Sequence, residues 1–168
     1  MKYLRQKKKR LTNSKETKTL KAEKSKLKND KLEIKSRTEN LASIREFINS
    51  AASEAGFSKE TIDKIILAVD EACTNIIKHA YKYFPDGKII LTLKTDKKTF
   101  TVEIIDYGNS FDPDLVPNPD LQKYFNEKRV GGLGMYLMKS LMDDVKYTSV
   151  PGKFNQVSLS KNINSNGR

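Results

Sequence analysis

The segment from Thr61 to Tyr83 constrains the fold more than any other part of this chain. Its apolar residues recur at spacings of three and four, which is the period of an α-helix buried along one stripe. A helix with such a stripe must pack against another element, so the segment predicts a core helix around which a domain is built. The stripe consists of Ile62, Ile65, Ile66, Val69, Cys73, Ile76, Ile77 and Ala80.

The opposite face of the same predicted helix presents a column of polar side chains. Glu71 and Asn75 are four residues apart, so a carboxylate and a carboxamide lie side by side, with Lys78 and His79 one turn further on. A carboxylate accepts a proton, and an amide oxygen ligates a hard cation such as Mg²⁺. Taken alone, such a column is more often a solvated helix face, so its meaning depends on the rest of the sequence.

Positive charge is concentrated in the first part of the chain. Residues 1–31 contain thirteen Lys or Arg and three Asp or Glu, a net charge of +10, whereas the whole chain has +11. Because this part is poor in apolar residues, we expect residues 1–30 to form a disordered or loosely helical basic arm. The rest of the chain is nearly neutral, so we expect no nucleic-acid binding by the folded part. Nucleic-acid binding through the arm remains an alternative to a solubilising tail.

The cysteine content and the hydropathy of the chain indicate the cellular compartment in which the protein is expected. Cys73 is the single cysteine, and its place on the apolar stripe predicts a small buried hydrophobic side chain. No disulfide can form within the chain, which fits a reducing cytoplasm. No apolar run reaches the length of a membrane span, and no apolar segment of a secretory signal follows the basic N-terminus. We therefore expect a cytoplasmic protein.

The order of the elements predicts an α+β fold over residues 31–162. Alternating residues predict strands and the helical period predicts helices, which gives an edge strand, two helices, a hairpin, a long loop, a third helix and a second hairpin. Helices segregated from a mostly antiparallel sheet form a two-layer α/β sandwich. Residues 163–168 are expected to be a flexible tail. The expected strands are Lys31–Arg37, Lys88–Thr95, Thr99–Asp106, Asp144–Val150 and Phe154–Ser160. The expected helices are Leu41–Ala55, Thr61–Tyr83 with Ser58 as its cap, and Met135–Met142, and the expected long loop is Tyr107–Val130.

Two further segments contain groups that could bind parts of a ligand. Asp106 ends an apolar strand shortly before Gly108, where its carboxylate can accept a hydrogen bond from an exocyclic amine such as that of adenine. The glycine run Gly131–Gly134 precedes a helix, whose N-terminus and close backbone N–H groups suit a phosphate. Arg129 adds a charge suited to phosphate oxygens. Each segment alone is equally compatible with a turn or a hinge.

The three segments, in this order, resemble the nucleotide-binding boxes of the ATPase superfamily shared by gyrase, Hsp90, histidine kinases and MutL. The resemblance is closest to the anti-sigma factor serine-protein kinases of bacteria, and it covers roughly Leu32–Asn162. Three boxes in the correct order and spacing make it specific. Two departures separate the chain from histidine kinases: Ser110 replaces a usual glycine, and the only histidine lies inside the first box. The boxes are AVDEACTNIIKHAY at 68–81, IDYGNSFDP at 105–113, and GGLGMYLM at 131–138 with LMD at 141–143.

The resemblance implies a role for each box. Glu71 would be the general base on the attacking hydroxyl, and Asn75 would coordinate the Mg²⁺ that bridges the phosphates of ATP. Asp106 would bind the adenine amino group, and Gly108 would let the backbone pass close to the base. The phosphate loop would supply further nucleotide contacts from Arg129, Gly131, Gly132, Leu133 and Gly134. Others would come from the two residues one turn beyond Asn75, Lys78 and His79.

By the same resemblance we expect a protein serine/threonine kinase. Its substrate would be a small STAS-type anti-anti-sigma antagonist, and a sigma factor would be the alternative partner, bound in the ATP state. The loop Asn109–Val130 would close over the nucleotide. Such proteins commonly form homodimers and act without touching DNA. A nucleotide-dependent binding module without phosphoryl transfer is the competing interpretation, and the intact Glu71 speaks against it.

Overall fold

A computed structural model describes residues 30–110 and 133–163. The predicted basic arm except Asp30, most of the predicted long loop, and the predicted tail except Ile163 therefore lie outside the described residues. The elements are β1 (Lys31–Lys35), η1 (Thr38–Asn40), α2 (Leu41–Glu54), α3 (Lys59–Asn75), η2 (Ile76–Ala80), β2 (Lys88–Thr95), β3 (Thr99–Asp106), α5 (Gly134–Leu141), β4 (Asp144–Val150) and β5 (Phe154–Asn162).

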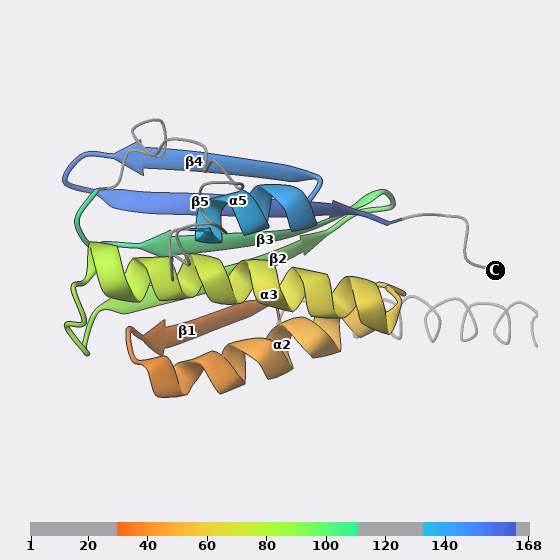
Figure 1. The fold of residues 1–168 in the computed structure, drawn as a ribbon, viewed down its shortest axis with the longest axis horizontal. Coiled ribbons are helices and arrows are strands. Elements are labelled where there is room, and N and C mark those ends of the chain that lie inside the picture. The colour runs from red at the N-terminus through yellow and green to blue at the C-terminus, as the bar shows by residue number, and fades with distance from the viewer. Residues whose placement is uncertain (1–29, 111–132, 164–168) are drawn as a thin grey trace, which may run out of the picture. The chain divides into compact units, whose positions relative to one another are not determined.

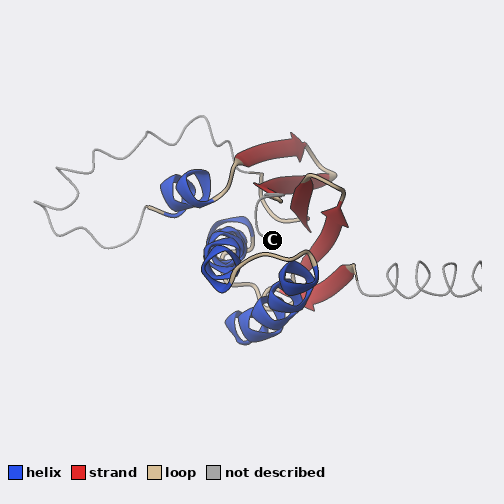
Figure 2. Ribbon diagram, turned by 90° about the vertical axis from the view of Figure 1, so that its right-hand side faces the viewer, coloured by secondary structure: helices blue, strands red, loops and turns tan. Residues whose placement is uncertain are grey.

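The strands form one sheet, and the helices cover one of its faces (Figure 1). The strand order is β1-β2-β3-β5-β4, so β1 occupies an edge as predicted. The pairs β2–β3, β3–β5 and β4–β5 are antiparallel. Figure 2 shows helices and strands as two separate layers. The predicted α+β two-layer sandwich is confirmed.

Strand β3 shows why the sheet has one buried face. Its residues alternate between partly exposed and buried, because successive side chains of a strand point to opposite faces. Phe100, Val102 and Ile104 lie on the face covered by the helices, and all are fully buried. Asp106 continues the same alternation, so the fold places a carboxylate at the end of an otherwise apolar row.

Helix α3 is the central helix of the layer. It contacts α2 on one side and α5 on the other, and it also lies against β3 and β5 (Figure 1). The predicted stripe is buried apart from Ile66, which is partly exposed. Cys73 is fully buried, as predicted, and this burial raises the pKa of its thiol. A core helix with a largely buried stripe fixes which of its residues can face a site.

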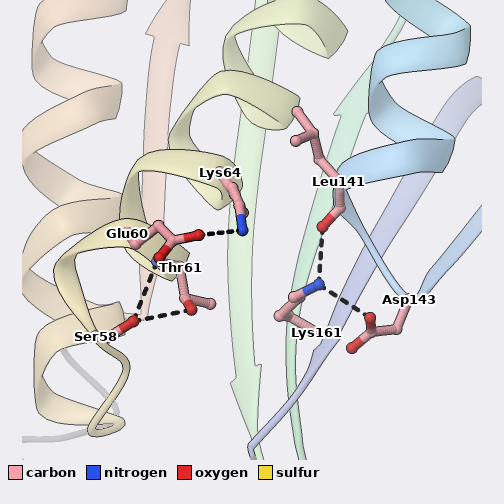
Figure 3. Close-up of polar contacts among 7 residues, drawn as sticks. All are labelled: Ser58, Glu60, Thr61, Lys64, Leu141, Asp143 and Lys161. Carbon is pink, nitrogen blue, oxygen red and sulfur yellow. Dashed lines mark hydrogen bonds and ion pairs between the residues drawn. The ribbon is translucent and has the colours of Figure 1, made fainter.

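Polar contacts define the ends of the helices (Figure 3). The predicted cap Ser58 is confirmed, because its Oγ accepts a hydrogen bond from the backbone N–H of Thr61 at 3.3 Å. At the end of α5, the ammonium of Lys161 donates to the carbonyl of Leu141 and to Asp143, both at 2.9 Å. These bonds satisfy a free carbonyl at the C-terminus of α5 and connect that helix to β5.

The predicted helix Thr61–Tyr83 is correct as a core element but wrong beyond Asn75. The α-helix ends at Asn75, and the five residues Ile76–Ala80 form a π-helix. In a π-helix a backbone N–H bonds to the carbonyl five residues earlier, as that of Tyr81 does to Ile76 at 3.0 Å, and such turns are often found at functional sites. The wider turn keeps Ile76, Ile77 and Ala80 buried. No helix in the described ranges is long and apolar enough to cross a membrane.

Candidate functional site

The start of α5 lies directly against the polar column of α3. A methyl group placed on Gly134 would lie 2.7 Å from Oε2 of Glu71 and 3.1 Å from Nδ2 of Asn75. Both distances are shorter than ordinary contact, so only a residue without a side chain fits there without displacing the two polar groups. Glu71 and Asn75 are themselves only partly exposed. The fold thus joins two of the predicted boxes at one point.

A second close approach joins the end of β3 to the π-helix. A methyl group on Gly108 would lie 2.6 Å from the carbonyl oxygen of Ala80 and 2.7 Å from its carbonyl carbon. The same carbonyl accepts a hydrogen bond from the N–H of Asn109 at 2.9 Å. Because the obstacle is backbone, it cannot swing aside as a side chain would. Gly108 is therefore needed for the backbone to pass close to the end of the helix.

Tyr81 reinforces this junction. Its hydroxyl donates to the carbonyl of Lys88 at 2.6 Å and accepts from the N–H of Tyr107 at 2.9 Å. Its ring lies against Gly87, where an added methyl group would meet ring carbons at 2.5 Å. One phenol therefore connects the segment after η2 to the start of β2 and the end of β3.

The carboxylate of Asp106 is buried beside this junction, with 4% of the residue exposed. Its Oδ1 accepts hydrogen bonds from the N–H of Gly108 at 2.9 Å and from Nδ2 of Asn155 at 3.0 Å. Burial raises the pKa of Asp106, and the two hydrogen bonds only partly offset that effect. A buried carboxylate that receives few hydrogen bonds is well suited to accept another from a bound amine.

A small polar pocket of about 130 Å³ opens beside this carboxylate. It lies between the end of β3 and the turn that joins β4 to β5. Gly108 and Asn155, both in contact with Asp106, form part of its wall. The other lining residues are Tyr107, Ser110, Val150, Gly152, Lys153 and Phe154.

Asp70, which precedes Glu71 in the sequence, lies in different surroundings. Asp70 turns toward α2, where its Oδ2 lies 2.6 Å from Nε of Arg45. Its Oδ1 is buried and, within the described ranges, has no hydrogen-bond partner. The two adjacent carboxylates therefore point to different neighbours: Glu71 lies beside α5, and Asp70 forms an ion pair with α2. Of the two, Glu71 is the one that lies against Gly134, the last residue of the predicted phosphate loop.

The structure brings together some of the predicted site residues and leaves others apart. Leu133 precedes α5 and accepts a hydrogen bond at its carbonyl from the N–H of Leu137 at 2.8 Å. Lys78 and His79 are exposed on the π-helix. Their role as nucleotide contacts remains a prediction. Three further predicted residues lie outside the described residues: Arg129, Gly131 and Gly132.

Asn155 is the site residue that sequence reasoning missed. It is the second residue of β5 and pairs with Asp106 on the neighbouring strand β3, which is why its amide reaches the carboxylate. No local motif marks it, because its position depends on the register between two strands separated by the whole third box. A hairpin signal alone places β5 but does not say which residue stands opposite Asp106.

The site offers few protein ligands for a metal ion. Within residues 30–110 and 133–163, no group of three or more His, Cys, Asp or Glu side chains could hold one. Mg²⁺ commonly takes one or two protein oxygens and completes its shell with waters and substrate phosphates. The amide oxygen of Asn75, beside Glu71 and the start of α5, fits a cation of that kind.

Known structures share this fold. The SiaB-SiaC complex from Pseudomonas aeruginosa matches with a TM-score of 0.53 at 12% identity, over 88% of this chain and 99% of that one. The RsbU and RsbW domains of a Mycobacterium tuberculosis protein match with a TM-score of 0.52 at 15% identity, over 78% of this chain and 32% of that one. At such identities the likeness concerns the fold alone.

Sequence comparison identifies the family. Residues 34–161 match the family described as the histidine kinase-like ATPase domain. The serine-protein kinase RsbW of Listeria monocytogenes is 36% identical over 119 residues, 68% of this chain and 76% of the relative. That of Bacillus subtilis is 33% identical over 138 residues, 79% of this chain and 84% of the relative. The chain therefore belongs to the histidine kinase-like ATPase family and, within it, to the serine-protein kinases of the RsbW type.

Proposed function

We propose that this kinase transfers the γ-phosphoryl group of ATP to a serine or threonine of a small STAS-type antagonist. The observation that supports this most directly is the contact of Gly134 with Glu71 and Asn75. It places a carboxylate and an amide at the start of α5, where a helix N-terminus favours the phosphates. A proton acceptor, a cation ligand and a phosphate-binding element at one point are the parts that phosphoryl transfer needs.

Each residue would have a defined task. Glu71 would take the proton from the attacking hydroxyl, and Asp106 would accept a hydrogen bond from the adenine amine. Gly108 would let the base lie against the backbone. The phosphate loop would hold the phosphates through backbone N–H groups and charge, with contributions from Arg129, Gly131, Gly132, Leu133, Gly134, Lys78 and His79.

Asn75 would hold Mg²⁺ through its amide oxygen, together with the phosphates of the nucleotide. When bound, the ion would neutralise charge on those phosphates. The protein residues would do the rest: Asn75 and the start of α5 orient the phosphate chain, and Glu71 receives the proton. Because little covalent work is required, positioning dominates the rate.

The biological role we propose is partner switching. In the ATP state the kinase would bind a sigma factor and withhold it from transcription, and phosphorylation of the antagonist would favour that complex. We further propose a cytoplasmic homodimer that makes no DNA contact. The sigma factor, the antagonist and the dimer follow from the family rather than from a contact in the structure, and sedimentation of the purified chain tests the dimer.

Incubation with γ-labelled ATP, Mg²⁺ and candidate STAS-type antagonists tests the kinase activity. We expect label on a serine or threonine of one antagonist and none on a histidine of the kinase, because the only histidine, His79, lies inside the first nucleotide-binding box. Tight, ATP-dependent antagonist binding without any transfer would instead identify a binding module and contradict the proposed reaction.

A further inference from the structure

Asn155 holds the buried carboxylate of Asp106 in place through one end of its amide. Nδ2 of Asn155 lies 3.0 Å from Oδ1 of Asp106, 3.3 Å from the carbonyl of Gly108 and 3.4 Å from that of Asn109. All three partners are acceptors only, so the end that faces them must be the NH₂ group. The orientation of this amide therefore follows from the chemistry of its three partners.

The other end of the amide is held as well. The hydroxyl of Ser149, on β4, donates to Oδ1 of Asn155 at 2.8 Å. The side chain thus spans from β4, through the first residues of β5, to the end of β3. With both ends engaged and the residue only partly exposed, the amide has little freedom to rotate away from Asp106.

We propose that Asn155 is a positioning residue for adenine recognition. By donating to Oδ1 it fixes the Asp106 carboxylate in one rotamer and directs Oδ2 toward a bound exocyclic amine. The inference deepens the proposed function, since it rests on Asp106 being the adenine contact. It adds a residue from outside the three nucleotide-binding boxes.

Two observations favour this role over that of a simple tie between strands. Both hydrogen bonds that the described residues give to the carboxylate of Asp106 end at the same oxygen, Oδ1. A tie between strands would need no bond to a carboxylate, whereas fixing one oxygen prepares the other for a ligand. The donor also favours the ionised form of a buried acid, which is the form that accepts from an amine.

The test compares binding of ATP with that of ITP, which lacks the 6-amino group, by titration calorimetry in the absence of antagonist. The wild type should prefer ATP. In Asn155→Leu, which keeps the size but removes the donor, the preference should fall about tenfold while ITP affinity changes little. Asn155→Thr retains a donor on a shorter side chain and should keep more of the preference than Asn155→Leu.

Gln156→Leu is the matched control, because it replaces the neighbouring amide, which points to the opposite face of β5 and pairs with Ile105. Its preference for ATP should equal that of the wild type. An unchanged preference in Asn155→Leu, or equal loss of both nucleotides in both Asn155 variants, would overturn the inference. So would a wild type that does not distinguish ATP from ITP. Failure of phosphoryl transfer would leave these measurements unaffected, so the two proposals can fail separately.

Discussion

At the scale of single residues, the burial of Asp106 lowers the stability of the fold at neutral pH while it leaves a carboxylate suited to accept a hydrogen bond from adenine. Its burial raises the pKa of the carboxyl above the usual range, so the folded protein binds a proton more readily there than the unfolded chain does. Above the raised pKa the ionised group therefore destabilises the fold. This destabilisation decreases as the pH falls through the folded pKa, and it is absent below the unfolded value of about 3.9.

Asp106→Asn should separate the two effects. The new amide oxygen can still accept from Gly108 and Asn155, but its NH₂ end opposes a bound amine. We expect unfolding in denaturant at pH 7 to show equal or greater stability, with the difference from wild type shrinking toward pH 4, and ATP binding to be lost.

Asp96→Asn is the control, because its effect on stability at pH 7 should have the opposite sign. Hydrogen bonds from the backbone N–H groups of Lys98 and Thr99 lower the pKa of Asp96, so its contribution is stabilising and is lost as the pH falls through that lowered pKa. This variant should be less stable than the wild type at pH 7 and bind ATP normally. A loss of stability in Asp106→Asn at pH 7 would contradict the account.

The contrast between Asp106 and Asn155 shows what the sequence reveals about the site. Asp106 ends an apolar strand beside Gly108, so its place follows from a local pattern. Asn155 acquires its role only when β5 pairs with β3 in one register, and that register depends on packing of the whole sheet. The same holds for the contact of Gly134 with Glu71, which depends on how α5 lies on α3.

At the scale of elements, the docking of α5 on α3 assembles the site. Gly134→Ala should test this docking, because the added methyl group meets the ends of two side chains that can move rather than backbone. We expect the free energy of unfolding to change by less than about 1 kcal/mol, since Ala also favours the helix. Phosphoryl transfer should fall more than tenfold, because Glu71 and Asn75 must shift.

Gly56→Ala provides the converse control in the same kind of assay. Gly56 has a φ of +86° in the turn between α2 and α3, away from the candidate site, and nothing lies within 4 Å of an added methyl group. The substitution should cost about 1 kcal/mol of stability through backbone strain while transfer is retained. Normal transfer by Gly134→Ala would mean that the contact at the start of α5 is unimportant.

The elements themselves follow closely from residue patterns. The bounds predicted for β2, β3 and β4 agree with the structure, because alternation and turn residues are local signals. The π-helix Ile76–Ala80 could not be predicted. Its apolar spacing still fits an α-helix, and the wider turn depends on how its buried residues and the Ala80 carbonyl meet the end of β3.

At the scale of the whole molecule, the charge and the candidate site lie in different parts of the chain. Residues 1–31 have a net charge of +10 out of +11. Deletion of residues 1–30 should therefore leave ATP binding and transfer unchanged. If the full chain binds DNA, that binding should weaken steeply with salt and disappear in the deletion variant. Transfer that depends on the arm would contradict the division of the chain into an arm and a catalytic domain.

Glu71 is proposed to be the base of this protein kinase, and the rate of transfer from ATP to the antagonist tests that role most directly. Glu71→Gln keeps the shape of the side chain and removes the proton acceptor. Asp70→Asn is the matched control, because Asp70 pairs with Arg45 on α2. We expect that Glu71→Gln binds ATP but transfers at least a hundredfold more slowly, and that Asp70→Asn transfers normally. Transfer by Glu71→Gln at the wild-type rate would contradict the role of Glu71 as the base.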